Sequence, residues 1–260
     1  AAQESRGLGD VYKRQVPTTA GTGAETESTA MVTHAGKGMK FCLDHPQLKI
    51  SAAILDPSLT LGLPPSLTAW TGVDALTHAI EAYIVPDFHP LCDGAAIEAL
   101  RLIGKYLVTS VEEPENLEAR GGMLVGSCLA GISFLKGLGF VHAISHMVGA
   151  EYDTQHGLTN AIVLPVVLRY NLPSLDEKRN RMADALGMSD KTSDGVIGEI
   201  EAKLDRLNIP KSVGEIGVPF ECASRISEKA MLDSAASTNP VRGDFASVKE
   251  LVEKSIKKAR

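Results

Sequence analysis

The stretch TGVDALTHAIEAY, residues 71–83, has the composition and spacing of an α-helix. Its two ligand-type side chains, Asp74 and His78, are four residues apart, and this spacing places them on one helix face. A carboxylate and an imidazole one helical turn apart can bind a single divalent metal ion. Thr71 followed by Asp74 is also a pattern typical of a helix start, and a single helical histidine is usually only a polar residue. Taken alone, the stretch leaves both interpretations open.

The sequence around this stretch, from residue 61 to the end, predicts further helices. In residues 95–108, apolar side chains recur at three- and four-residue steps and share one face. The same spacing recurs in residues 245–256, where lysines and glutamates lie between the apolar positions. Helices are also predicted over residues 119–134 and, despite Pro165, over residues 161–170. We therefore expect an all-helical domain over 61–260.

Residues 16–60 have a different character, with short β-prone runs set off by turn residues. These runs are residues 28–33, 39–43 and 51–55. Three short strands do not make a stable sheet by themselves, so they are interpreted as the remainder of a larger sheet. The expected fold class is an α/β remnant followed by an all-α domain.

The first fifteen residues, AAQESRGLGDVYKRQ, carry no initiator methionine, no apolar period and no signal pattern. They resemble a translated adaptor sequence, and a natural exposed segment is the alternative. We interpret residues 1–15 as a non-native segment that makes no native contacts. The recognisable sequence begins at Val16 in the middle of a motif, so the natural amino terminus is expected to lie upstream.

Composition and charge exclude several classes of protein. The chain has 44% hydrophobic and 22% charged residues, as is ordinary for a globular protein, and its net charge of −6 argues against nucleic-acid binding. No run approaches the roughly 18 apolar residues of a membrane span. The four cysteines are far apart and form no CxxC pair, which favours a reducing compartment over a disulfide framework. A cytoplasmic protein without nucleic-acid or membrane partners is therefore expected.

A second cluster of ligand-type residues lies in VHAISHMVGAEYDTQHG, residues 141–157. His142, His146 and His156 are three of the seven histidines, and they fall within fifteen residues. His142 and His146 share one helical face, and Gly149 is expected to end that helix so that His156 begins the next one. The alternative is a polar helix face with a capping histidine.

Together the two clusters offer one aspartate and up to four histidines. Imidazole ligands suit zinc, iron and nickel, and a carboxylate offsets part of the charge of a divalent ion. The absence of cysteine ligands argues against a closed structural zinc site. A catalytic metal ion with an open coordination position is the better hypothesis.

A third motif, VPTTAGTGAE, occupies residues 16–25. Thr18, Thr19 and Thr22 supply hydroxyl groups, whereas Gly21 and Gly23 allow backbone N–H groups to approach a ligand closely. Such a loop can hold phosphates or the amide of a nicotinamide. A simple Gly/Thr turn between strands has the same composition.

The order of the motifs resembles the iron-containing (group III) alcohol dehydrogenases, and the resemblance runs from Val16 to the end of the chain. It rests on these segments: TTAGTG, DPSLTLGLPP, TGVDALTHAIEAY, GLGFVHAISH and YDTQHGLTNAIVLP. The resemblance implies that four residues hold the metal ion: Asp74, His78, His142 and His156. It also implies that His146, one turn after the third ligand, lies near the substrate.

The resemblance further implies a dehydroquinate synthase-like architecture in which residues 16–60 are the remnant of a nucleotide-binding domain. The implied ligands are Fe²⁺ or Zn²⁺, NAD or NADP, and a small alcohol or aldehyde, in a homodimer of the full-length protein. The cofactor would be held by Thr18, Thr19, Gly21 and Thr22. Hydride would pass between the alcohol carbon and the nicotinamide ring, and His146 is the candidate for moving the proton.

Two departures from the family pattern matter. The Gly-Gly-Gly-Ser phosphate loop of the family does not occur in this sequence, so the 260 residues alone are expected to bind metal without nicotinamide and to be inactive. The stretch 132–136 is about one residue shorter than is common before the third ligand, which affects the substrate pocket. A metallohydrolase and a purely helical metal-binding module remain the alternatives.

Overall fold

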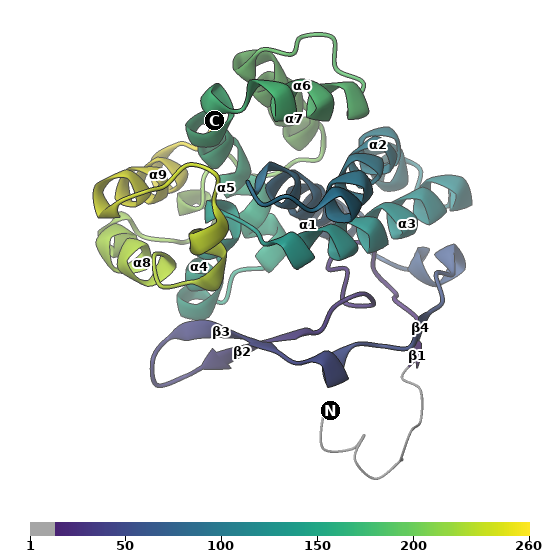
Figure 1. Cartoon of the computed structure of the whole chain (residues 1–260), viewed down its shortest axis with the longest axis horizontal. Helices are drawn as coiled ribbons and strands as arrows, with labels where there is room; N and C mark the ends of the chain where they lie inside the picture. The colour runs from purple at the N-terminus through teal and green to yellow at the C-terminus, as the bar shows by residue number, and fades with distance from the viewer. Residues whose placement is uncertain (1–13) are drawn as a thin grey trace.

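Helices make up most of the computed structural model, which describes residues 14–260, and the strands lie along one side of them (Figure 1). The helices are α1 (Pro65–Ile84), α2 (Pro90–Glu112), α3 (Leu117–Ser133), α4 (Phe140–Tyr152), α5 (His156–Asn171), α6 (Asp176–Ala185), α7 (Ser193–Arg206), α8 (Ala223–Ala230) and α9 (Phe245–Lys257). Every helix expected from the sequence is present, and the fold class of a β segment followed by an all-helical domain is confirmed.

Helix α1 is the central helix, because it packs against α2, α3 and α5 and is buried along most of its length. It begins at Pro65, where a proline is favourable because the first N–H groups of a helix have no partner inside the helix. The interpretation of Thr71 as a helix start is therefore wrong: its hydroxyl donates to the carbonyl of Leu67 at 2.8 Å, in the interior of the helix. Pro86 follows the last turn and disfavours its continuation.

The expected helix end at Gly149 is also wrong. Helix α4 continues to Tyr152, since a single glycine costs a helix only about 1 kcal/mol. It ends at Asp153, whose φ of 52° is left-handed, a conformation that aspartate tolerates better than most residues. Gln155 then caps α5 by accepting a hydrogen bond from the N–H of Leu158 at 2.6 Å. His156 is the first residue of α5, as expected.

The strands form two separate two-stranded sheets within residues 14–260. Strands β2 (Thr29–His34) and β3 (Met39–Asp44) form an antiparallel hairpin, which Figure 1 shows lying across the ends of α4 and its neighbours. Strand β4 covers only Ala52–Ala53, where a five-residue run was expected, and it pairs in parallel with β1 (Arg14–Gln15). The expected non-native segment 1–15 thus overlaps the paired structure at two residues, whereas residues 1–13 lie outside the described part.

Helices α6, α7 and α8 complete the helical domain, and the core runs continuously from α1 to α9. Among the described residues, no single helix is both long and apolar enough to cross a membrane. One pair, Leu117–Lys136 with Phe140–Tyr152, has that length and composition only when its two members are taken together, and it is bent by 102°.

Candidate metal centre

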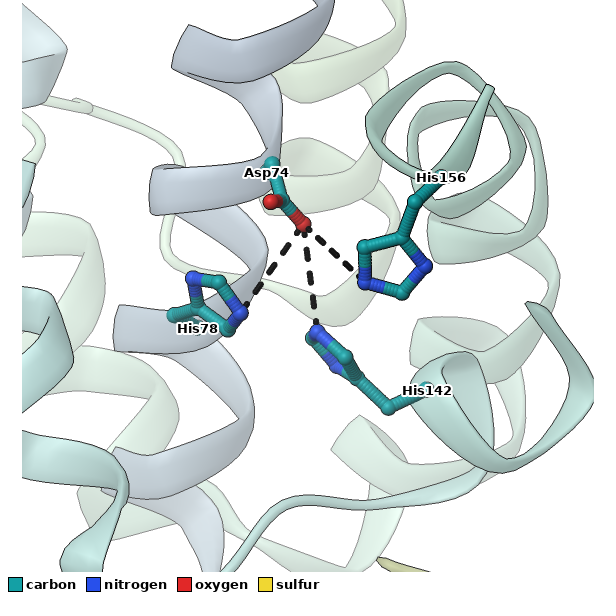
Figure 2. Close-up of side chains that lie close together, drawn as sticks. All are labelled: Asp74, His78, His142 and His156. Carbon is teal, nitrogen blue, oxygen red and sulfur yellow. Dashed lines mark ion pairs between the residues drawn. The ribbon is translucent and has the colours of Figure 1, made fainter. Parts of the chain in front are cut away.

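Four side chains from three helices converge on one point inside the helical domain (Figure 2). Helix α1 supplies Asp74 and His78, α4 supplies His142, and α5 supplies His156. The Asp74 Oδ1 atom is 3.9 Å from the Nε2 atom of His78, 3.8 Å from that of His142 and 3.7 Å from that of His156. One donor atom from each residue lies within 4.8 Å of every other. The structure thus brings together all four ligand residues that the sequence suggested.

The spacing and chemistry of these donors fit one divalent ion. Bonds of about 2.0–2.2 Å to four tetrahedral donors place the donors about 3.4 Å from one another. The observed separations of Asp74 Oδ1 from the three histidines need only a small contraction to match. Three imidazoles and one carboxylate suit Fe²⁺ or Zn²⁺ and leave net positive charge on the ion.

Burial favours the neutral form of the three histidines in the cluster, which is the form that binds metal. Burial lowers the pKa of His142 well below its ordinary value, and the neighbouring His78 and His156 lower it further. Burial lowers the pKa of His156 to about 4, although the Asp74 carboxylate opposes this shift. Burial likewise lowers the pKa of His78. Near neutral pH an incoming cation therefore has no proton to displace from these rings.

Two further residues contact the ligands and were not identified from the sequence. Glu81 lies on the same face of α1 as Asp74 and His78, and its Oε2 atom is 2.6 Å from His142 Nδ1. Asn160, one turn after His156, donates from Nδ2 to Asp74 Oδ1 at 2.7 Å. Each of the two residues lies one helical turn after a candidate ligand and on the same helix face, so this spacing in the sequence could have indicated them.

His146 lies beside the cluster without belonging to it. Its ring stacks on that of His156, with centroids 5.3 Å apart and an interplanar angle of 14°. Its Nδ1 atom is 2.9 Å from Oδ2 of Asp233, which is buried in the loop after α8. Asp233 has no periodic relation to any motif in the sequence, so no local pattern could have indicated it.

The cluster forms one wall of a cavity of about 560 Å³ between the helical domain and the β2–β3 hairpin. The hairpin side contributes Glu27, and burial raises the pKa of this carboxyl to about 7, while a hydrogen bond from Thr29 opposes the rise. The remaining lining includes His146, Thr22, Met31 and the segment Phe134–Leu138. The candidate metal centre thus forms a polar end of a largely apolar cavity.

The segment 132–136 borders this cavity, as expected. Phe134 begins a short 3₁₀ turn, and its ring lies 4.9 Å from that of His78. The Lys136 side chain is only 1% exposed, and its ammonium contacts Asp93 and, at 3.2 Å, the carbonyl oxygen of Tyr83. Lys136 therefore has a structural partner at the end of α1.

The glycines of the 16–25 loop have a packing role that the sequence did not indicate. A Cβ atom on Gly21 would lie 2.5 Å from the Thr71 carbonyl oxygen, and one on Gly23 would lie 2.7 Å from the Cα of Gly131. The loop thus packs closely on α1 and α3. Thr22 lines the cavity, whereas Thr18 is exposed and lies outside the cavity lining.

Fold and site together define a helical domain with a candidate divalent-metal centre at the wall of a cavity. The sequence model of the "Fe-containing alcohol dehydrogenase family, C-terminal" matches residues 68–256. The chain belongs to the iron-containing alcohol dehydrogenase family.

Similar proteins include alcohol and diol dehydrogenases. The chain is 39% identical to 1,3-propanediol dehydrogenase of Citrobacter freundii over 91% of its own length and 63% of the relative's. It is 35% identical to the NAD-dependent methanol dehydrogenase of Bacillus methanolicus, over 96% and 69% respectively. A crystal structure of 1,3-propanediol oxidoreductase superimposes with a TM-score of 0.89 at 36% identity, covering 93% of this chain and 65% of that one.

The chain spans between 57% and 69% of the length of the curated relatives it matches. These relatives do not favour a metallohydrolase or a purely helical metal-binding module.

Proposed function

We propose that this chain is the metal-binding part of an alcohol dehydrogenase that interconverts a small primary alcohol or diol and the corresponding aldehyde, using NAD or NADP. The observation that carries the proposal is the cluster of Asp74 with three neutral histidines beside a non-ligand histidine in the wall of a cavity. Relatives named for methanol and 1,3-propanediol support small alcohols as the substrate class.

The chemistry is divided between the bound groups and the protein. When bound, a divalent ion polarises the substrate oxygen and a nicotinamide accepts or supplies the hydride. The protein holds the ion through Asp74, His78, His142 and His156, and three neutral imidazoles preserve its positive charge. Apolar side chains from the hairpin and the segment 134–138 keep water away from the reacting end of the cavity.

We assign proton transfer to His146. Because its Nδ1 atom is bonded to Asp233, the opposite nitrogen, Nε2, remains for the substrate hydroxyl. The shared cavity and the stacking on His156 support a position of the ring beside the metal ligands. In alcohol oxidation His146 takes the hydroxyl proton, and in aldehyde reduction it returns that proton.

We also propose that Thr18, Thr19, Gly21 and Thr22 hold the cofactor, since Thr22 lines the same cavity as the metal ligands. Within residues 14–260 the strands form only two small sheets, whereas dinucleotide sites are built on larger parallel sheets. The 260 residues alone are therefore expected to bind metal without saturable NADH or NADPH binding at micromolar concentration. Fluorescence titration measures this directly, and saturable binding would place the complete cofactor site within these residues.

The metal-binding part of the proposal is tested on the chain as it is. Zn²⁺ and Fe²⁺ affinities are measured by competition with a chelator for the wild type, His156→Ala and His146→Ala. We expect at least a hundredfold loss for His156→Ala and less than a threefold change for His146→Ala. Equal losses would show that His146 is a ligand, and equal wild-type and His156→Ala affinities would refute the site.

The catalytic part requires a fusion to the cofactor-binding segment of a relative. In such a fusion we expect metal-dependent oxidation of 1-propanol or 1,3-propanediol, followed through NADH formation. His146→Ala should lower turnover while the metal content stays constant. Oxidation that persists after the metal is removed would contradict the proposed role of the cluster.

A further inference from the structure

Glu81 is a buried carboxylate whose contacts set it apart from the four metal ligands. Its side chain is 1% exposed, and it lies on α1 one turn beyond His78. Its Oε1 atom accepts from the N–H of Val141 at 2.8 Å, and its Oε2 atom faces the N–H of His142 at 3.3 Å and His142 Nδ1 at 2.6 Å. Both oxygens thus point at the first turn of α4.

The first turn of α4 lacks the cap that a helix usually supplies for itself. Its N-cap residue is Gly139, which has no side chain to accept from the free N–H groups. A Cβ atom at this position would lie 2.7 Å from Glu81 Oε1, so glycine also makes room for the carboxylate. The free N–H groups of this turn are therefore capped from outside the helix: Asn239 Oδ1 accepts from Phe140 at 3.1 Å, and Glu81 of α1 accepts from Val141 and His142.

The same carboxylate determines which nitrogen of His142 carries the proton. Asn160 Nδ2, which is a donor, lies 3.1 Å from His142 Nε2, so Nε2 accepts and the ring proton lies on Nδ1, facing Glu81 Oε2. Glu81 Oε2, 2.6 Å from Nδ1, accepts this proton, and the Nε2 lone pair is then directed toward Asp74 in the site. Only that tautomer can donate Nε2 to a metal ion.

We propose that Glu81 is a positioning residue for the metal centre: it fixes the tautomer and ring orientation of His142 while capping the helix that carries it. The proposal rests on the metal site of the proposed function, and it assigns no ligand role to Glu81. One side chain of α1 thereby orients a ligand on α4, so the two helices that contribute to the site are aligned by the same group.

Replacing Glu81 with glutamine separates this role from simple capping. Glutamine has one acceptor and one donor in place of two acceptors, so it cannot satisfy Val141 N–H and His142 Nδ1–H together. If its amide nitrogen faces His142, Nδ1 must accept and the proton moves to Nε2, which blocks the metal. If it faces Val141, the N–H of Val141 loses its acceptor and the first turn of α4 shifts. We expect a ten- to hundredfold loss of metal affinity, as for other partners of metal-binding histidines.

The experiment combines two measurements on the full 260-residue chain. Zn²⁺ affinity is measured by chelator competition for the wild type, Glu81→Gln and the control Glu98→Gln, which removes an equivalent charge from the exposed face of α2. In chelator-treated protein labelled with ¹⁵N-histidine, NMR reports the tautomer of His142, assigned through His142→Ala. We expect the Nδ1–H form in the wild type and in Glu98→Gln, and a shift toward Nε2–H in Glu81→Gln.

The two measurements fail in distinguishable ways. If the wild type binds Zn²⁺ no better than His142→Ala, the proposed metal site is wrong, whereas the tautomer still tests Glu81. If Glu81→Gln keeps the Nδ1–H tautomer and binds Zn²⁺ within twofold of the wild type, Glu81 has no positioning role. Should Glu81→Gln not fold, Glu81→Asp is the second variant, because it keeps the carboxyl group but shortens the side chain by one methylene and so moves the group away from α4. An unchanged His142 tautomer and Zn²⁺ affinity in Glu81→Asp would then overturn the proposal.

Discussion

Gly157 gives the sharpest test of how the packing of α1 against α5 holds the metal ligands in place. A Cβ atom on Gly157 would lie 2.4 Å from the carbonyl oxygen of Trp70 and 3.1 Å from the Cβ of Asp74. Real Cβ contacts essentially never fall below 3.0 Å, so Gly157→Ala must separate the two helices by about 0.6 Å. Because Asp74 and His156 flank this contact, their donor atoms must separate as well.

The size of the effect follows from the same geometry. Overpacking a close contact by one methyl group costs about 1–3 kcal/mol of folding stability. If the full displacement falls on the 3.7 Å separation of Asp74 Oδ1 and His156 Nε2, these two donors lie about 4.3 Å apart. If an ion has to work against the same roughly 1–3 kcal/mol to draw these donors together, its affinity falls by about five- to 150-fold.

Thermal unfolding and Zn²⁺ titration of the same preparations measure both quantities. The matched control is Gly198→Ala on the exposed face of α7, where an added Cβ meets nothing within 4 Å. This control is expected to stabilise the protein by about 0.5–1 kcal/mol and to leave Zn²⁺ affinity unchanged. If Gly157→Ala also stabilises the protein, or binds Zn²⁺ as tightly as the wild type, the helix contact does not set the ligand geometry.

Two further predictions concern buried charges. Burial raises the pKa of Glu27 to about 7, so the unfolded chain loses this proton first and wild-type stability falls between pH 4.5 and 7. The free energy of unfolding of Glu27→Gln relative to the wild type should therefore rise with pH, by at most about 3 kcal/mol at pH 7. Urea unfolding with chelator present measures this difference, and a difference that is constant with pH would contradict the burial of Glu27. Asp93→Asn removes the charged partner of the buried Lys136 ammonium and should destabilise the fold by about 1–3 kcal/mol, whereas a change below 0.5 kcal/mol would show that the Tyr83 carbonyl suffices.

The helical half of the fold could be predicted because its signal is local. In α2 and α9, apolar residues repeat at three- and four-residue steps, and these positions are the ones that the structure buries. The ends were less predictable, because Gly149 and Thr71 carry signals that the surrounding packing overrides. The strands were predictable only as short runs, since a strand is defined by its partner and the pairing of β1 with β4 joins segments that share no motif.

The residues of the candidate site likewise differ in whether local spacing in the sequence could predict them. Asp74 with His78, and His142 with His156, were suggested by spacing within the sequence and by the family resemblance. Glu81 and Asn160 continue the same helix faces and could have been found by extending the ligand spacing by one turn. Asp233 could not, because it reaches His146 only through the packing of α8 against α4.

Because the four candidate ligands lie on three helices, an ion bound there would act as a reversible cross-link. Asp74 and His156 are 82 positions apart, so an ion bound by both closes a long loop of the chain, as a disulfide would. Unlike a disulfide, this closure follows mass action: a free-ion concentration a thousandfold above the Kd adds about 4 kcal/mol to the free energy of unfolding. Two preparations of the same chain that differ only in trace metal should therefore unfold at different temperatures, so the melting temperature itself reports the occupancy of the centre.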